Sequence, residues 1–136
     1  LTERSFLEYL HELDHKISFL YEKTPNEIKC FNDIHDILYK LKIKAISRIR
    51  EFILQKIYQF RKPMANYQIT QDILLKSRFF YEFLTLYDNT VARECREEYI
   101  NTLSKVYYSY FKEYSSKLGK LQVTSLFHFY SISSFN

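Results

Sequence analysis

The chain has 136 residues, of which 46% are hydrophobic and 26% charged, with a formal net charge of +4. This length and apolar content suffice for one sizeable core, so we expect a single domain. The charge is too small for the dense basic footprint of a nucleic-acid-binding domain, and we expect no nucleic acid partner.

The composition also disfavours an enzyme. The chain holds one glycine, two prolines and no tryptophan, but 13 tyrosines and 12 phenylalanines. Strand-rich folds need many tight turns, and phosphate loops and nucleophile elbows need glycine. We therefore expect an all-α protein with no catalytic residues and no cofactor.

The apolar runs are too short for a membrane-spanning helix, which needs ~20 residues. No signal-peptide pattern follows Leu1, and we interpret the sequence as a fragment of a longer protein. Cys30 and Cys95 lack the spacing of a disulfide framework or a zinc ribbon, so reduced cytosolic thiols are expected.

Two helices are predicted in the first half of the chain. Over residues 4–23, apolar side chains recur in steps of three and four, at Phe6, Leu10, Leu13, Ile17 and Leu20. Thr24 and Pro25 form an N-cap pattern for a second helix over residues 25–61. Its apolar stripe runs through Phe31, Ile34, Leu38, Leu41, Ala45, Ile49, Phe52, Ile53, Ile57 and Phe60. A helix of this span would be ~55 Å long, which favours an elongated rod.

Two further helices are predicted after it. Thr70 is the expected cap of a helix over residues 70–86, and Thr90 that of a helix over residues 91–118. Gly119 stands where a C-terminal glycine cap belongs. The expected fold is an elongated bundle or rod of about four helices in one domain, residues 1–122. Residues 123–136 have no clear period, and a short helix, an added strand and disorder all stay open.

One short motif matches a zinc hydrolase pattern. His11, Glu12 and His15 satisfy HExxH, which places two imidazoles on one helical face with a glutamate as base. A third ligand and a strand to hold a substrate are missing from the pattern. We interpret the match as coincidental, expect no metal site, and keep a zinc hydrolase as a third hypothesis.

A basic stretch lies in the second predicted helix and just after it. Its members are Lys40, Lys42, Lys44, Arg48, Arg50, Lys56, Arg61 and Lys62. These residues could contact anionic lipid headgroups or an acidic partner helix, or they could form a solvated face whose stems cover the apolar stripe. Aromatic residues crowd the third and fourth helices, and consecutive helical side chains point about 100° apart. Some rings must therefore face outward, and Tyr81 and Tyr108 suit a partner surface.

Longer blocks of the sequence resemble the vacuolar protein sorting-associated protein 52 family. The similarity extends from about residue 10 to residue 122, with the closest blocks at residues 48–58 (RIREFILQKIY), 60–63 (FRKP), 66–69 (NYQI), 74–76 (LLK), 78–81 (RFFY), 98–99 (EY) and 103–105 (LSK).

This resemblance implies a subunit of the Golgi-associated retrograde protein (GARP) complex and its endosome-associated recycling relative (EARP), which tether vesicles before fusion. It implies a CATCHR-type segment, that is, a helical-rod tether, at the cytosolic face of the trans-Golgi network and endosomes. The implied partners are sister subunits 51, 53 and 54, with Rab-type small GTPases and Golgi syntaxin SNAREs as further contacts. A scaffold in endosome-to-Golgi retrograde transport is the first functional hypothesis. A peripheral membrane module that binds anionic lipids through residues 40–62 is the alternative.

Overall fold

In the computed structural model, the described residues are 4–22, 31–62 and 66–133, with side chains described as far as residue 123. They form five helices and no strand: α1 (Arg4–Glu22), α2 (Phe31–Gln59), α3 (Tyr67–Lys76), α4 (Arg78–Tyr87) and α5 (Asn89–Ser133). The predicted all-α architecture is confirmed. Within these described ranges, none of the helices is both long and apolar enough to span a bilayer.

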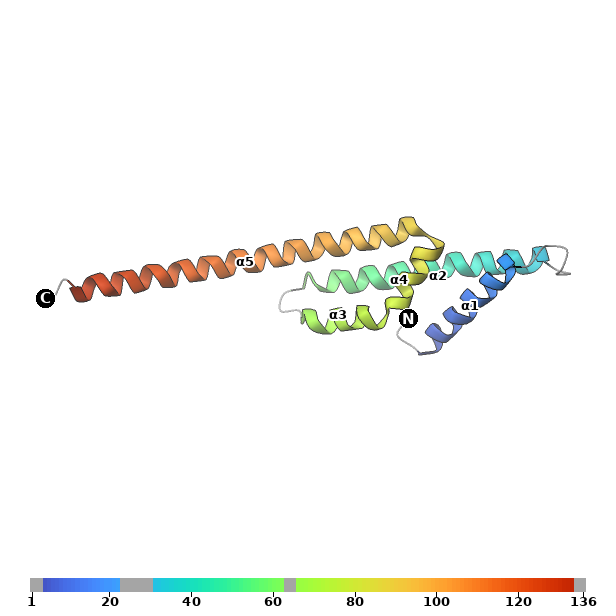
Figure 1. Cartoon of the computed structure of the whole chain (residues 1–136), viewed down its shortest axis with the longest axis horizontal. Coiled ribbons are helices and arrows are strands. Elements are labelled where there is room, and N and C mark those ends of the chain that lie inside the picture. The colour runs from blue at the N-terminus through green and yellow to red at the C-terminus, as the bar shows by residue number, and fades with distance from the viewer. Residues whose placement is uncertain (1–3, 23–30, 63–65, 134–136) are drawn as a thin grey trace.

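The molecule is elongated (Figure 1). α5 has 45 residues, which corresponds to a length of about 68 Å. α2 contacts α1, α3, α4 and α5, and it lies beside the first part of α5. The far end of α5 extends beyond the other helices, and α1 lies at an angle to α2. The expected helical rod is therefore present, with a packed body at one end and a single helix at the other.

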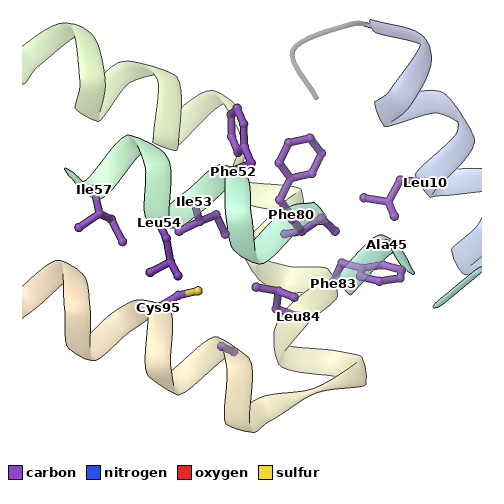
Figure 2. Close-up of a cluster of buried hydrophobic side chains, with 12 residues drawn as sticks. Leu10, Ala45, Phe52, Ile53, Leu54, Ile57, Phe80, Phe83, Leu84 and Cys95 are labelled. Carbon is purple, nitrogen blue, oxygen red and sulfur yellow. The ribbon is translucent and has the colours of Figure 1, made fainter. Parts of the chain in front are cut away.

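The body is held together by a core between α1, α2, α4 and α5 (Figure 2). Phe80 of α4 lies between two other rings, with centroid distances of 5.7 Å to Phe6 and 5.5 Å to Phe52. The buried cluster consists of Leu10, Ala45, Ile49, Phe52, Ile53, Leu54, Ile57, Phe80, Phe83, Leu84, Ala92 and Cys95. Burial of these side chains stabilises the fold, at ~1.5–3 kcal/mol for a large apolar residue.

A polar contact joins α1 to the end of α4. The Tyr87 hydroxyl donates a hydrogen bond to Asp14 Oδ1 at 2.7 Å. Burial raises the pKa of Tyr87 to about 12, and the hydrogen bond to Asp14 contributes to the shift. The phenol is therefore neutral at physiological pH and remains a donor to Asp14.

The third predicted helix, over residues 70–86, is divided at Ser77. The Ser77 amide donates to the carbonyl oxygens of Ile73 and Leu74, both at 3.1 Å, and its backbone adopts φ −97° and ψ 20°. This conformation ends α3, and α4 starts in a new direction (Figure 1). The change of direction brings Phe80, Phe83 and Leu84 into the core.

The predicted caps at Thr70 and Thr90 were wrong. Asn66 caps α3, because its side-chain oxygen accepts hydrogen bonds from the Gln68 and Ile69 amides at 3.1 and 3.3 Å. Thr70 lies inside α3 and is buried. Asp88 precedes α5, and its Oδ1 accepts from the Val91 amide at 3.1 Å. Asparagine and aspartate are as good as threonine in this role, so residue type alone does not locate the cap.

The predicted end of the last helix was also wrong. Gly119 is part of α5, and a Cβ at this position would meet nothing within 4 Å. One glycine costs a helix only about 1 kcal/mol, so the backbone continues through it. α5 extends to Ser133, so most of the tail left open by the sequence is helical, and no helix ends at the predicted domain boundary at residue 122.

The remaining helix ends agree to within a few residues where they are described. α1 ends at Glu22 against the predicted 23, and α2 ends at Gln59 against the predicted 61. Three turn bonds follow α2, from the amides of Phe60, Arg61 and Lys62 to carbonyls three residues earlier. Thr24, Pro25 and Cys30 lie outside the described residues.

Candidate interaction surfaces

Two residues of the basic stretch, one in α2 and one in the turn just after it, form contacts with α5. Arg50 donates two hydrogen bonds to the Glu94 carboxylate, at 2.8 and 2.5 Å. The hydrogen bond holds the pKa of Glu94 below its ordinary value and raises the pKa of Arg50. Arg61 pairs with Glu98 and donates to Thr102 Oγ1 at 3.0 Å. Both guanidinium groups therefore act between helices and are already paired.

Two other members lie over aromatic rings. The Lys42 ammonium is 5.1 Å from the centroid of Tyr39 and 5.8 Å from that of Tyr87, while Lys56 is 5.4 Å from Phe52. These contacts are of the cation–π type, and Lys42 and Lys56 are half-buried. The stems of these lysines cover apolar surface.

The four remaining basic residues, Lys40, Lys44, Arg48 and Lys62, are exposed. Lys40, Lys44 and Arg48 are spaced by four and lie in one row on α2, whereas Lys62 follows the end of that helix. The members of the basic stretch therefore have different surroundings: two form ion pairs with α5, two lie over aromatic rings, three form an exposed row on α2, and Lys62 is exposed after that helix. It does not bring all eight residues to a common face.

The HExxH residues are separately engaged. The His11 ring stacks on Phe79 with centroids 3.8 Å apart, and Glu12 forms an ion pair with Lys16 at 2.6 Å. His15 is exposed on the same helix. Among the residues that the structure describes, no three histidine, cysteine, aspartate or glutamate side chains are grouped to hold a metal ion.

A groove lies between α1 and α2. It has a volume of about 970 Å³, and we call it the α1–α2 groove. Its lining is mainly apolar and comes from both helices: Phe6, Tyr9, Leu10, Leu13, Phe19, Leu20, Ile34, Ile37, Leu38, Leu41 and Ala45. Leu10, Leu20, Leu38 and Ala45 are buried, whereas Tyr9 and Ile37 are more than half exposed. Ile34 and Leu41 belong to the stripe that the sequence predicted to be core, but they are 40% and 46% exposed.

A second apolar surface lies on α5 from Tyr107 onward. It consists of Tyr107, Phe111, Tyr114, Leu118 and Leu121, and we call it the α5 seam. Their exposed fractions range from 47% to 70%. The steps between them are four, three, four and three residues, which is the heptad spacing of a coiled coil. At about 100° per residue, the seam lies roughly a quarter turn around α5 from the side that carries the buried residues Ala92, Cys95 and Thr102.

The two tyrosines predicted to face a partner lie in different surroundings. Tyr108 is 70% exposed and stands next to the α5 seam. Tyr81 is 38% exposed and lines a hollow of about 610 Å³ between α2, α3, α4 and α5. Tyr110, two residues after Tyr108, accepts a hydrogen bond from the Tyr67 hydroxyl at 2.9 Å, which joins α3 to α5.

The sequence matches a known family model. The model described as the Vps52/Sac2 family, coiled-coil, matches residues 1–84. This chain belongs to the Vps52/Sac2 family. Residues 1–84 include α1, α2 and α3 and most of α4, so the match contains both walls of the α1–α2 groove.

Individual relatives extend the match. A vacuolar protein sorting-associated protein 52 homolog from Caenorhabditis elegans is 50% identical over 120 residues, 88% of this chain. The homolog from Homo sapiens is 50% identical over 122 residues, and protein 52 A from Arabidopsis thaliana is 35% identical over 124 residues, each covering 90% of the chain. No solved structure matches. The chain spans only 17% to 18% of the length of these relatives. The family predicted from the sequence blocks is confirmed.

Proposed function

We propose that this chain is a non-catalytic scaffold segment of a multisubunit vesicle-tethering complex and acts through protein–protein contacts. The process is vacuolar protein sorting, and within it endosome-to-Golgi retrograde transport by the GARP and EARP complexes. The place of action is the cytosolic face of the trans-Golgi network and endosomes. Sister subunits 51, 53 and 54 are the proposed partners, with Rab-type GTPases and Golgi syntaxins as further contacts.

The α5 seam is the observation that carries this proposal. Five large apolar side chains at heptad spacing extend over about 20 Å of helix, and they are between 47% and 70% exposed. Soluble proteins rarely expose an apolar surface of this kind unless another protein binds it. Heptad spacing selects a second helix as the binding element, because its side chains fit between those of the seam.

Charge favours a different protein over a second copy of this chain. Lys105, Lys112, Lys117 and Lys120 accompany the seam, against one acid, Glu113, which pairs with Lys117 at 2.7 Å. Two copies of this helix side by side would bring lysines together, and like charges disfavour pairing. A sister subunit with acidic flanks on its helix would avoid this repulsion.

The test is a binding assay with purified sister subunits. The immobilised chain is compared with a variant that carries Phe111→Asp and Leu118→Asp, which charges the seam. A matched control carries Ser109→Asp and Ser116→Asp, which adds the same charge to the opposite side of the same stretch of α5. All four positions are exposed, so the body should keep its stability.

We expect the wild-type chain and the serine variant to retain at least one sister subunit, and the seam variant to lose it. Retention of no subunit by the wild-type chain would refute the proposal that this segment makes the contact. Equal retention by both variants would refute the role of the seam.

A further inference from the structure

The α1–α2 groove is a large apolar surface that is separate from the α5 seam. Leu10 and Ala45 in its lining are buried, at 3% and 8% exposed, whereas Ile37 and Tyr9 at its edges are 60% and 69% exposed. The groove therefore has a closed apolar floor and open apolar walls. The described lining on α2 extends from Ile34 to Arg48, about 21 Å along the helix axis.

The charged residues of the groove are mostly basic. Lys16 stands on the α1 side, and Lys44 and Arg48 stand on the α2 side. Among the described residues that line the groove, Glu12 is the single acid, and it is paired with Lys16 at 2.6 Å. Arg48 reaches Glu51 only at 3.8 Å, and no described residue forms an ion pair with Lys44. The groove therefore carries a net positive charge on the α2 side.

The shape of the surface distinguishes between occupants. An apolar trough about four helical turns long accommodates the apolar face of an amphipathic helix, with anchors at i, i+3 or i+4, and i+7. A membrane contact would require apolar side chains that protrude toward the lipid, whereas the apolar floor of the groove is recessed between two helices. The exposed part of α5 in a second copy is basic, so it would meet the basic wall with like charge.

We propose that the α1–α2 groove is a docking site for an amphipathic helix with acidic flanks from a partner protein. The apolar face of that helix occupies the trough, and its acidic flank faces Lys44 and Arg48. This inference deepens the proposed function, because it names a second contact surface of the scaffold and the chemistry of its partner.

The experiment measures binding of a synthetic helical peptide of about 18 residues to the purified 136-residue chain by fluorescence anisotropy. The peptide carries leucines at helical spacing and glutamates on both flanks. A matched peptide has each flanking glutamate replaced by lysine. We expect the glutamate peptide to bind about tenfold more tightly at low salt, and the difference to narrow at high salt because rim charges are screened.

Three variants test the residues. Lys44→Glu with Arg48→Glu should reverse the preference, so that the lysine peptide binds better. Lys105→Glu with Lys112→Glu makes the same change in net charge on α5 and should leave the preference as in the wild type. Ile37→Gln with Leu41→Gln removes apolar walls without changing charge and should weaken both peptides by about tenfold or more.

Four outcomes would overturn the inference. Equal binding of the two peptides would refute the proposal that the partner helix is acidic. The same would follow if Lys44→Glu with Arg48→Glu still preferred the glutamate peptide. A membrane would be the occupant if the chain pelleted with phosphatidylserine vesicles, if Lys44→Glu with Arg48→Glu abolished that pelleting, and if the vesicles displaced the peptide. Self-association that Ile37→Gln with Leu41→Gln abolishes would assign it to a second copy.

The peptide assay is separable from the test of the α5 seam. The Phe111→Asp and Leu118→Asp variant should bind the glutamate peptide as the wild type does, because its substitutions lie on the other surface. If the seam variant loses the sister subunits but the wild-type chain does not bind the glutamate peptide, only the groove proposal is refuted. If the wild-type chain binds the peptide but the seam variant keeps the sister subunits, only the seam proposal is refuted.

Discussion

Replacing one phenylalanine in the body and one on the α5 seam by alanine should have very different effects on the free energy of unfolding. Phe83 is 2% exposed, and its ring centroid is 4.6 Å from that of Tyr87, whereas Phe111 is 70% exposed. Phe83→Ala removes a fully packed ring and leaves a cavity, which costs about 3–5 kcal/mol. Phe111→Ala removes a ring that already contacts water, and its effect should stay within about 0.5 kcal/mol.

Urea unfolding of the purified chain, followed by near-ultraviolet circular dichroism, measures both values at 25 °C. With an unfolding entropy of about 2.1 cal/mol/K per residue, Phe83→Ala should also lower the melting temperature by about 10–17 °C. Measurements at two protein concentrations control for self-association. If Phe111→Ala lowered the free energy of unfolding as much as Phe83→Ala at both concentrations, the far part of α5 would have to pack against the body. That result would refute the reasoning on the seam.

Three further predictions concern single side chains. Gly119→Ala should slow amide exchange in the far part of α5 about fivefold, because alanine favours a helix interior by about 1 kcal/mol; faster exchange would indicate a glycine cap instead. In a Cys30→Ser background, Cys95 should react with iodoacetamide at pH 8 at least about a hundredfold more slowly in the folded chain than in urea, since burial raises its thiol pKa to about 11. Glu94 has a lowered pKa when folded, so its ion pair stabilises the fold above the unfolded pKa of about 4.3 and ceases to do so as the pH falls through the folded value. Glu94→Gln should therefore reduce stability at pH 7, by less than about 1 kcal/mol for so exposed a pair, and its difference from the wild type should shrink as the pH falls through the folded pKa of Glu94.

The apolar period was sufficient to predict the helices and most of the core. Ile49, Phe52, Ile57 and Phe60 were predicted on one stripe of the second predicted helix, and all four are buried. The same period could not separate them from Leu41, which is exposed. Periodicity identifies the apolar side of a helix, but burial depends on whether another helix covers that side, and α1 covers only part of it.

The residues of the candidate surfaces were harder to predict. Arg50 and Arg61 looked like the other members of a basic stretch, because their partners Glu94 and Glu98 are more than 35 residues away in the sequence. Predicting the α1–α2 groove requires the relative position of two helices, and no local sequence pattern specifies that position. The break at Ser77 was missed because serine carries no strong helix-stopping signal.

Because α5 is one uninterrupted helix, it fixes the angle about its axis between the side that packs into the body and the seam. The core side near Cys95 and the seam near Phe111 belong to one helix, so the angle between them depends on how many residues separate them. Each residue added or removed in this span would turn the seam by about 100° relative to the body, whereas seven residues would return it close to its original direction while shifting it by about 10 Å. This span should therefore tolerate substitutions far better than single insertions, because only the number of residues sets the direction in which the seam faces relative to the body.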